Sequence, residues 1–438
     1  MSLPIDRPTD PDIGSVREPY LHGNEAKRIK SCHALITEQA VTEALKADQG
    51  AEAQLASWQI EDHQQGRQPQ RDGDERATRL RPERGRRTPL KRNPGHDREV
   101  FEEVTRKLFL KEAEFYSNLL PQLNAVLEEA GMKPLAMPRC FYSAVERKKE
   151  LVLLEDLRPR GFKMFDRRKG LDVAHVSLVL EELARLHAAS LLLEKKEPQY
   201  FRGTCLNRGW AHLFEGAVDL GFVLGQHIDS AKAMLDKIGG YESAATWAES
   251  LKPKLQDIFE KQMEPTKYHV LCHGDAWNNN LLFSYRADGS PEAVMFVDLQ
   301  ICRRVSFATD INYLLYTSLT GDVRKPNLDA LLETYRGQFN AVMETRGGSE
   351  GRLSEGEVLQ EFRQKNVIGA IFTRMLISVI LLEPQDVEEL SDLKDKEIDE
   401  CFLELRKEAL DLVDSNPFMR PRFLAVVEEL VETGLVPA

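Results

Sequence analysis

Long apolar runs are absent from this 438-residue sequence. No stretch approaches the roughly 18 uninterrupted apolar residues of a membrane-spanning helix. The first residues contain no apolar core of the kind that marks a secretory signal peptide. We therefore expect a protein that neither crosses nor binds a membrane, with the cytoplasm as its default location.

The sequence also contains few cysteines and carries no net positive charge. The six cysteines are scattered, with no Cys-x-x-Cys pair and no cluster with histidine at metal-ligand spacing, which argues against a zinc site. We expect reduced, mostly packed thiols. The formal net charge of −12 argues against a general nucleic-acid-binding protein.

Apolar residues are nearly missing from residues 63–90, where arginine is frequent and only Ala77, Leu80 and Leu90 are apolar. This composition predicts no core strand. A basic arm for nucleic acid or anionic lipid is the functional alternative, but the stretch lacks interleaved aromatic residues.

The chain is too long for one simple core, so two lobes are expected. We expect a flexible leader over residues 1–30, a first lobe over 31–155 that contains the anomalous stretch, and a second lobe over 156–438.

The most informative stretch has the sequence LCHGDAWNNN, from Leu271 to Asn280. Asn280 follows Asp275 by five residues, and Asp298 ends a later apolar run. Phosphoryl transfer from a nucleotide needs one carboxylate to accept a proton, and an amide oxygen and a second carboxylate to hold magnesium. His-Gly-Asp alone could be an ordinary turn in which Asp275 caps its own backbone. Asn280, Asp298 and the later Asp310 favour the phosphoryl-transfer site.

Hydrophobic periodicity predicts the elements around this motif. Helices are expected over 31–47, 97–120, 172–193 (with Asp172 as its N-cap), most of 209–263, 328–339, 359–382, 397–412 and 422–433. Strands are expected over 140–145 and 150–155, which form a hairpin, and over 267–272, 281–285 and 294–298 around the motif.

Four segments together resemble the ecdysteroid kinase-like proteins of arthropods: His273 to Asn280, Val297 to Gln300, Leu153 to Leu157 and Glu182 to Ser190. That family is related to choline kinases and aminoglycoside phosphotransferases within the protein-kinase-like superfamily, and the resemblance covers about residues 91–435. It implies an α+β, two-lobed kinase-like fold with a small N-lobe β-sheet, a large mainly helical C-lobe, and MgATP in the cleft.

The resemblance implies a role for each motif residue. Asp275 and His273 are the expected catalytic residues: Asp275 accepts the proton of the substrate hydroxyl, while His273 and Asp310 hold the shape of the loop. Asn280 and Asp298 are the expected Mg²⁺ ligands.

The expected nucleotide-binding residues also follow from the resemblance. Lys91 matches the lysine of a Lys-x-x-Pro motif that reaches the nucleotide phosphates. Glu112 falls in an apolar helical stripe, where an unpaired carboxylate is costly, and the resemblance supplies Lys91 as its partner. The alternative is a glutamate at the edge of the stripe that reaches water. The adenine-binding hinge is expected at Glu155, Asp156 and Leu157.

For two further residues, His187 and Trp277, the sequence allows a purely structural role in the core. His187 lies on the apolar face of its helix, and we expect a hydrogen-bonded packing residue rather than a catalyst. Trp277, beside Asp275, is either a stacking surface for a flat acceptor or part of the core.

The glycine-rich phosphate loop of such kinases is not found. Gly66, Gly73 and Gly85 are not flanked by strand-like runs. Either residues 63–90 come from a wrong reading frame or a mis-joined exon, which is our preferred hypothesis, or the protein is a pseudokinase that has lost the loop.

The expected function is transfer of the ATP γ-phosphoryl group to a hydroxyl of a small molecule, an ecdysteroid or a similar polyhydroxylated sterol. A choline, ethanolamine or aminoglycoside kinase is the first alternative, and a pseudokinase that only binds its ligand is the second.

Overall fold

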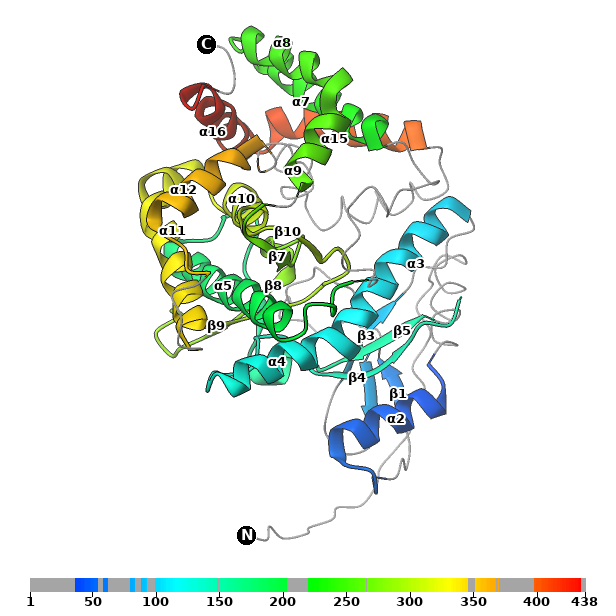
Figure 1. The fold of residues 1–438 in the computed structure, drawn as a ribbon. Helices are drawn as coiled ribbons and strands as arrows, with labels where there is room; N and C mark the ends of the chain where they lie inside the picture. The colour runs from blue at the N-terminus through cyan, green and yellow to red at the C-terminus, as the bar shows by residue number, and fades with distance from the viewer. Residues whose placement is uncertain are drawn as a thin grey trace.

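The computed structural model describes residues 36–53, 58–61, 79–82, 88–92, 99–147, 150–202, 220–264, 266–345, 351–367, 369 and 398–434. The expected leader over residues 1–30 and all three glycines of the anomalous stretch lie outside these ranges. A β-sheet with adjoining helices lies toward the N-terminal end, and helices make up most of the remainder (Figure 1). The fold class is α+β, as predicted.

The N-terminal sheet has the strand order β1-β2-β3-β5-β4, and each neighbouring pair is antiparallel. The β4–β5 hairpin confirms the prediction for residues 140–155. The strands are β1 (Trp58–Glu61), β2 (Arg79–Pro82), β3 (Thr88–Arg92), β4 (Cys140–Ala144) and β5 (Leu151–Leu154).

Helix α2 (Glu38–Gln49) covers this sheet, because Ile36, Val41 and Leu153 belong to one buried apolar cluster. The helix expected from residue 31 begins at Glu38. Its start is fixed by Thr37, whose hydroxyl accepts a hydrogen bond from the amide of Ala40 at 3.2 Å.

Residues 63–90, whose composition predicts no core strand, do contribute strands to the sheet. Strand β2 lies within this stretch, and β3 overlaps its end. Pairs such as Leu80 with Thr88 and Leu90 with Leu153 are joined through main-chain groups. A strand held between two partners therefore does not need the apolar side-chain pattern on which the prediction relied.

A long helical segment follows the third strand. Helix α3 (Glu99–Glu114) continues through a π-helical turn at Phe115–Leu119 into α4 (Leu120–Glu129), which confirms the helix expected over 97–120. Helix α5 (Val173–Lys196) packs against α4, and its N-cap Asp172 accepts a hydrogen bond from the amide of His175 at 2.9 Å. This cap was also predicted.

The LCHGDAWNNN motif lies between two small sheets. Strand β7 (His269–Cys272) leads into it and pairs with β10 (Arg303–Ser306). Strand β8 (Leu281–Tyr285) follows it and lies between β6 (Lys163–Met164) and β9 (Pro291–Phe296). Because β7 and β8 bury their apolar side chains, both ends of the motif are anchored in the core.

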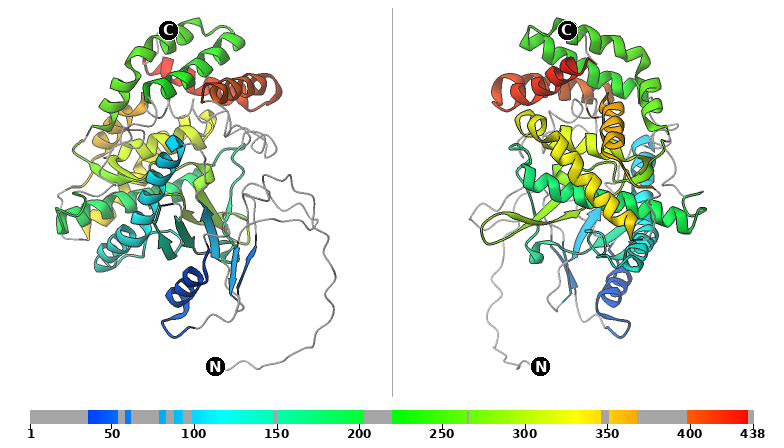
Figure 2. Two further views of the ribbon diagram at one scale, coloured as in Figure 1. Left: turned by 90° about the vertical axis from the view of Figure 1, so that its right-hand side faces the viewer. Right: turned by 60° about the vertical axis from the view of Figure 1, so that its left-hand side comes forward.

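Most of the remaining chain is helical, and Figure 2 shows the green helices of residues 220–263 and the red helices of residues 398–432 at the end of the molecule away from α2. Every residue of α10 is buried, which places that helix at the centre of the core. No described helix is long and apolar enough to cross a membrane. The helices are α7 (Leu220–Ile238), α8 (Glu242–Leu251), α9 (Leu255–Met263), α10 (Phe307–Ser318), α11 (Gly321–Glu344), α12 (Glu355–Gln364), α15 (Ile398–Ser415) and α16 (Met419–Glu432).

Candidate active site

Asp310 anchors the backbone of the motif from helix α10. Its carboxylate accepts hydrogen bonds from the amides of His273, at 2.7 Å, and Gly274, at 2.9 Å. The imidazole Nε2 of His187 lies 3.1 Å from the same carboxylate. Burial disfavours the charged form, but these hydrogen bonds and the two nearby histidines hold the pKa of Asp310 below its usual range. A buried carboxylate therefore fixes the first turn of the motif.

His273 links the motif to the segment that carries Asp298. Its Nε2 donates to the carbonyl of Val297 at 3.2 Å, and its Nδ1 accepts from the amide of Asp275 at 3.3 Å. Burial lowers the pKa of this imidazole, which favours the neutral form. Of the two expected catalytic residues, His273 has the geometry of a structural link.

Asp275 lies at the centre of the site, and both of its carboxylate oxygens are held. Oδ2 accepts from the Asn280 amide at 2.9 Å, and Oδ1 accepts from the hydroxyl of Tyr313. Burial, assisted by the charge of Asp298, raises the pKa of Asp275 to about 7, against the opposing effects of Tyr313, Asn280 and Arg303. This position suits a group that accepts and releases a proton.

Asn280 and Asp298 come together as the sequence predicts. The amide of Val297 donates to the carbonyl of Asn280 at 3.1 Å, so the residue before Asp298 is joined directly to the motif. Asp298 has a φ of 69°, a left-handed conformation that residues other than glycine rarely adopt. Such backbone strain is typical of functional positions.

Helix α3 contacts the segment that follows Asp298. The buried carboxylate of Glu112 accepts from the amide of Leu299 at 3.2 Å, and the ammonium of Lys111 lies 3.4 Å from the carbonyl of Cys302. Glu112 thus points inward, as expected from its place in the apolar stripe. Lys91 lies in β3 opposite Val152. The structure describes the backbone of Lys91 but not its side chain, so the expected Lys91–Glu112 ion pair stays a prediction.

The segment expected to form the hinge follows β5 directly. The amide of Glu155 donates to the carbonyl of Arg139, and the carbonyl of Leu157 accepts from the amide of Arg160. The carboxylate of Asp156 is paired with Arg158 at 2.8 Å. Within the described residues, the carbonyl of Glu155 and the amide of Leu157 make no hydrogen bond.

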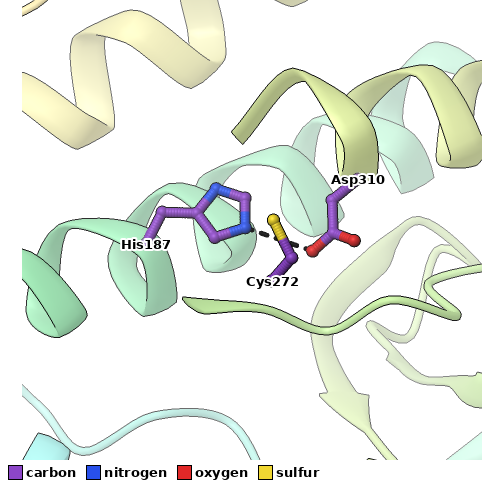
Figure 3. A group of neighbouring side chains, drawn as sticks. All are labelled: His187, Cys272 and Asp310. Carbon is purple, nitrogen blue, oxygen red and sulfur yellow. Dashed lines mark hydrogen bonds and ion pairs between the residues drawn. The ribbon is translucent and has the colours of Figure 1, made fainter. Parts of the chain in front are cut away.

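His187, Cys272 and Asp310 form a buried cluster whose ligand atoms all lie within 4.8 Å of one another (Figure 3). Sequence spacing did not indicate it. Each atom already has a protein partner: His187 bonds to Tyr335 and Asp310, and the Cys272 thiol lies 3.4 Å from the carbonyl of Ser306. Burial raises the pKa of the Cys272 thiol well above its usual value, so the thiolate needed for a metal is disfavoured. The cluster is a hydrogen-bonded network, and His187 is the packing residue that was predicted.

Two residues at the site, Tyr313 and Arg303, are not predicted from the sequence. Tyr313 contacts Asp275, and the guanidinium of Arg303 is buried close enough to influence the pKa of Asp275. Gly274 has a φ of 85°, and a Cβ there would overlap the Arg303 guanidinium and the Ile301 carbonyl. Gly274 itself belongs to the motif predicted from the sequence, but Ile301 and Arg303, which crowd it, lie 27 and 29 residues further along the chain.

Trp277 belongs to the core. Its side chain is 9% exposed and is part of the main apolar cluster. Of its two sequence-based interpretations, the structure supports the core residue rather than a stacking surface.

The sequence profile of the ecdysteroid kinase-like family matches residues 83–347, more than half of the chain. No curated protein matches the sequence. Among solved structures, choline kinase from Cryptosporidium parvum shares 13% identity, with 91% of this chain and 98% of that chain covered and a TM-score of 0.42. Ethanolamine kinase from Plasmodium vivax shares 13% identity, with 79% and 80% covered and a TM-score of 0.38.

Choline kinase from Streptococcus pneumoniae shares 12% identity, with 77% of this chain and 89% of that chain covered and a TM-score of 0.35. Because these structural scores are low, the assignment rests on the profile match. The chain belongs to the ecdysteroid kinase-like family, with its two-lobed kinase-like fold and its small-molecule phosphotransferase chemistry.

Proposed function

We propose that the protein transfers the γ-phosphoryl group of ATP to a hydroxyl group of a small molecule. The observation that carries this proposal is the hydrogen bond from the Asn280 amide to the Asp275 carboxylate, beside Asp298. This contact supports the proposal because it orients a candidate proton acceptor next to two side chains that could supply oxygen ligands to a cation, as phosphoryl transfer requires.

The donor set fits Mg²⁺. An amide oxygen and a carboxylate are hard ligands of the kind that Mg²⁺ prefers. Since the Asn280 nitrogen is bonded to Asp275, its oxygen is the end left for a cation. Asn280 and Asp298 would hold the ion. When bound, Mg²⁺ supplies neutralisation of the charge on the phosphates.

The residues of this chain account for the remaining chemistry. Asp275 accepts the proton of the acceptor hydroxyl as the oxygen–phosphorus bond forms and the bond to the ADP oxygen breaks. Asn280 orients that carboxylate, and Asp310 and His273 hold the loop in place. For the nucleotide, we propose that the Glu155 carbonyl and the Leu157 amide bind adenine and that Lys91 reaches the phosphates.

The acceptor that we propose is an ecdysteroid-like, polyhydroxylated sterol. Family membership supports this choice. Trp277 is too buried to act as a stacking platform, so the acceptor must be recognised by other side chains.

We also propose a cytoplasmic location. The thiols of Cys140 and Cys272 support it: within the described residues neither forms a disulfide, and reduced cysteines are usual in a reducing compartment. We propose no nucleic-acid or membrane partner, in keeping with the net charge of −12.

Transfer of labelled γ-phosphate from ATP to ecdysone, choline, ethanolamine and kanamycin tests the function and the acceptor together. We expect labelled ecdysone with the wild-type protein and with Asp288→Asn, which alters an exposed carboxylate in the β8–β9 turn. Asp275→Asn and Asp298→Ala should reduce transfer by at least about 100-fold. Labelling of choline or kanamycin instead would replace the sterol assignment, and no transfer to any acceptor would overturn the proposal.

A further inference from the structure

Tyr313 holds the carboxylate oxygen of Asp275 that Asn280 leaves free. Its hydroxyl donates to Oδ1 of Asp275, while the Asn280 amide donates to Oδ2. Tyr313 is 4% exposed, so its ring is fixed by packing in the main core. The two donors together define the plane of the carboxylate.

Helix α10 therefore holds the motif at two points, one turn apart. Asp310 accepts from the backbone amides of His273 and Gly274, and three residues later Tyr313 reaches the side chain of Asp275. Residues three apart lie on neighbouring positions of a helix surface. Since every residue of α10 is buried, both contacts come from one rigid element.

The contact from Tyr313 leaves hydrogen-bonding capacity on the Asp275 carboxylate for an acceptor hydroxyl. An ionised carboxylate can accept about four hydrogen bonds, two on each oxygen. The carboxylate of Asp275 receives one on each oxygen from Tyr313 and Asn280. Each oxygen therefore keeps the capacity for one further hydrogen bond, which a substrate hydroxyl could donate. Without Tyr313, Asn280 would hold one oxygen only, and the carboxylate could rotate away from the orientation needed for proton transfer.

We propose that Tyr313 is a positioning residue for phosphoryl transfer: its hydroxyl fixes the orientation in which Asp275 meets the acceptor hydroxyl. This inference rests on the proposed function. It assigns to Tyr313 no contact with the nucleotide.

The experiment compares Tyr313→Phe with the wild-type protein in two assays: transfer from MgATP to ecdysone, and hydrolysis of MgATP by water with no acceptor present. The second assay uses the same carboxylate but does not depend on the acceptor being correct. We expect kcat to fall about tenfold in both, with KM for ATP changed less than about twofold. The matched control is Tyr316→Phe, on the same helix, whose hydroxyl bonds to Glu429 instead and whose kcat should be unchanged.

A second comparison separates positioning from general damage to the fold. In an Asp275→Asn background, Tyr313→Phe should cause no further loss of MgATP hydrolysis, because Tyr313 acts through the carboxylate that is already gone. An additive loss, or an unchanged kcat in the single variant, would overturn the inference.

The two assays also distinguish this inference from the proposed function. If ecdysone is not labelled but Tyr313→Phe still slows MgATP hydrolysis and Tyr316→Phe does not, the acceptor assignment fails and the role of Tyr313 stands. If the wild-type protein neither hydrolyses MgATP nor labels ecdysone, both fail.

Discussion

Asp310 and Asp275 are both carboxylates in the core of the site, but their surroundings differ. Asp310 receives two backbone amides and the imidazole of His187, and its pKa is lowered. Asp275 receives two uncharged side-chain donors, and burial, assisted by the charge of Asp298, raises its pKa to about 7 against their opposing effect. One carboxylate is thus suited to hold the loop and the other to exchange a proton.

Asp310→Asn should loosen the motif. An amide can offer one acceptor oxygen, so one of the two loop amides would face an NH₂ group and lose its partner. We expect a destabilisation of about 2–4 kcal/mol and a loss of phosphoryl transfer. Chemical denaturation measures the first and the ecdysone assay the second. Asp288→Asn, in an exposed turn, is the control. Unchanged stability in Asp310→Asn would contradict this role.

Gly274→Ala tests the tight approach of Arg303 to the motif. The added methyl would overlap the Arg303 guanidinium and the Ile301 carbonyl, and the φ of 85° is unfavourable for alanine. We expect a destabilisation of at least about 2 kcal/mol. Gly289→Ala also has a positive φ, of 83°, but open space around the added methyl. A smaller loss there would isolate the steric part of the effect.

The sequence predicts which residues of the motif carry chemistry but not what surrounds them. The spacing of Asp275, Asn280 and Asp298 is local information, and the structure brings these residues together. Arg303 reaches the site from β10 and Tyr313 from α10, and neither lies in the motif whose spacing indicates the chemistry. No pattern within one segment could identify them.

Among the helices, α12 has an N-terminal capping residue, Glu357, that also binds side chains from the segment before β7. Glu357 accepts from the Ser354 amide and hydroxyl, the Lys267 ammonium and the Tyr268 hydroxyl. The hydrogen bonds from Lys267, Tyr268 and Ser354, in that order of effect, lower the pKa of Glu357 to about 2. A capping residue thus also joins α12 to the segment before β7.

The pH dependence of Glu357→Gln follows from this shift. The folded pKa is below the unfolded value of 4.5, so the stabilisation by the carboxylate is complete above about pH 4.5 and disappears as the pH falls through about 2. The side chain is 33% exposed, so the stabilisation should stay below about 1 kcal/mol.

Thermal melts at pH 7 and pH 3 measure the effect. The difference in Tm between the wild-type protein and Glu357→Gln should be smaller at pH 3 than at pH 7. Glu355→Gln, in the same first turn but exposed, controls for the helix dipole. An equal or larger difference at pH 3 would contradict the account.

A second contact between elements joins α10, α11 and α16. Glu429 pairs with the Arg324 guanidinium at 2.6 Å and accepts from the Tyr316 hydroxyl at 2.7 Å. Arg324 is 1% exposed. Loss of Glu429 would therefore leave a buried cation without its carboxylate.

Glu429→Leu should destabilise the protein by about 3–5 kcal/mol. Glu428→Leu, on the neighbouring exposed position of α16, should cost less than about 1 kcal/mol. The double variant Arg324→Met with Glu429→Leu should recover much of the loss, because no charge is then left buried. Urea denaturation measures all three, and a double variant as unstable as Glu429→Leu would contradict this explanation.

Helices and strands are predicted correctly where their side chains show an apolar or capping pattern. They are not predicted where main-chain pairing with distant strands holds the segment in place. The hairpin of β4 and β5, the Asp172 cap and the α3–α4 helix follow from apolar spacing and capping chemistry. Strand β2 has no such pattern, and its place between β1 and β3 depends on pairing with distant strands. The sequence predicts that the first helix begins at residue 31, but α2 begins at Glu38, because Thr37 is its N-cap.

At the scale of the whole molecule, one apolar cluster extends from α3 and α4 through the strands of the motif to α16. This continuity holds Glu112, Asp298 and Asp275 in one framework although they come from three parts of the chain. The two-lobed fold was predicted from the resemblance, and the family match confirms it. The division into a leader and lobes at residues 30 and 155 stays a prediction.

Calorimetry of MgATP binding to the full-length protein tests whether the kinase site is assembled. We expect magnesium-dependent binding to the wild-type protein and to Asp288→Ala, and no magnesium-dependent binding to Asp298→Ala. Failure of the wild-type protein to bind MgATP, or equal binding by Asp298→Ala, would contradict an assembled kinase site.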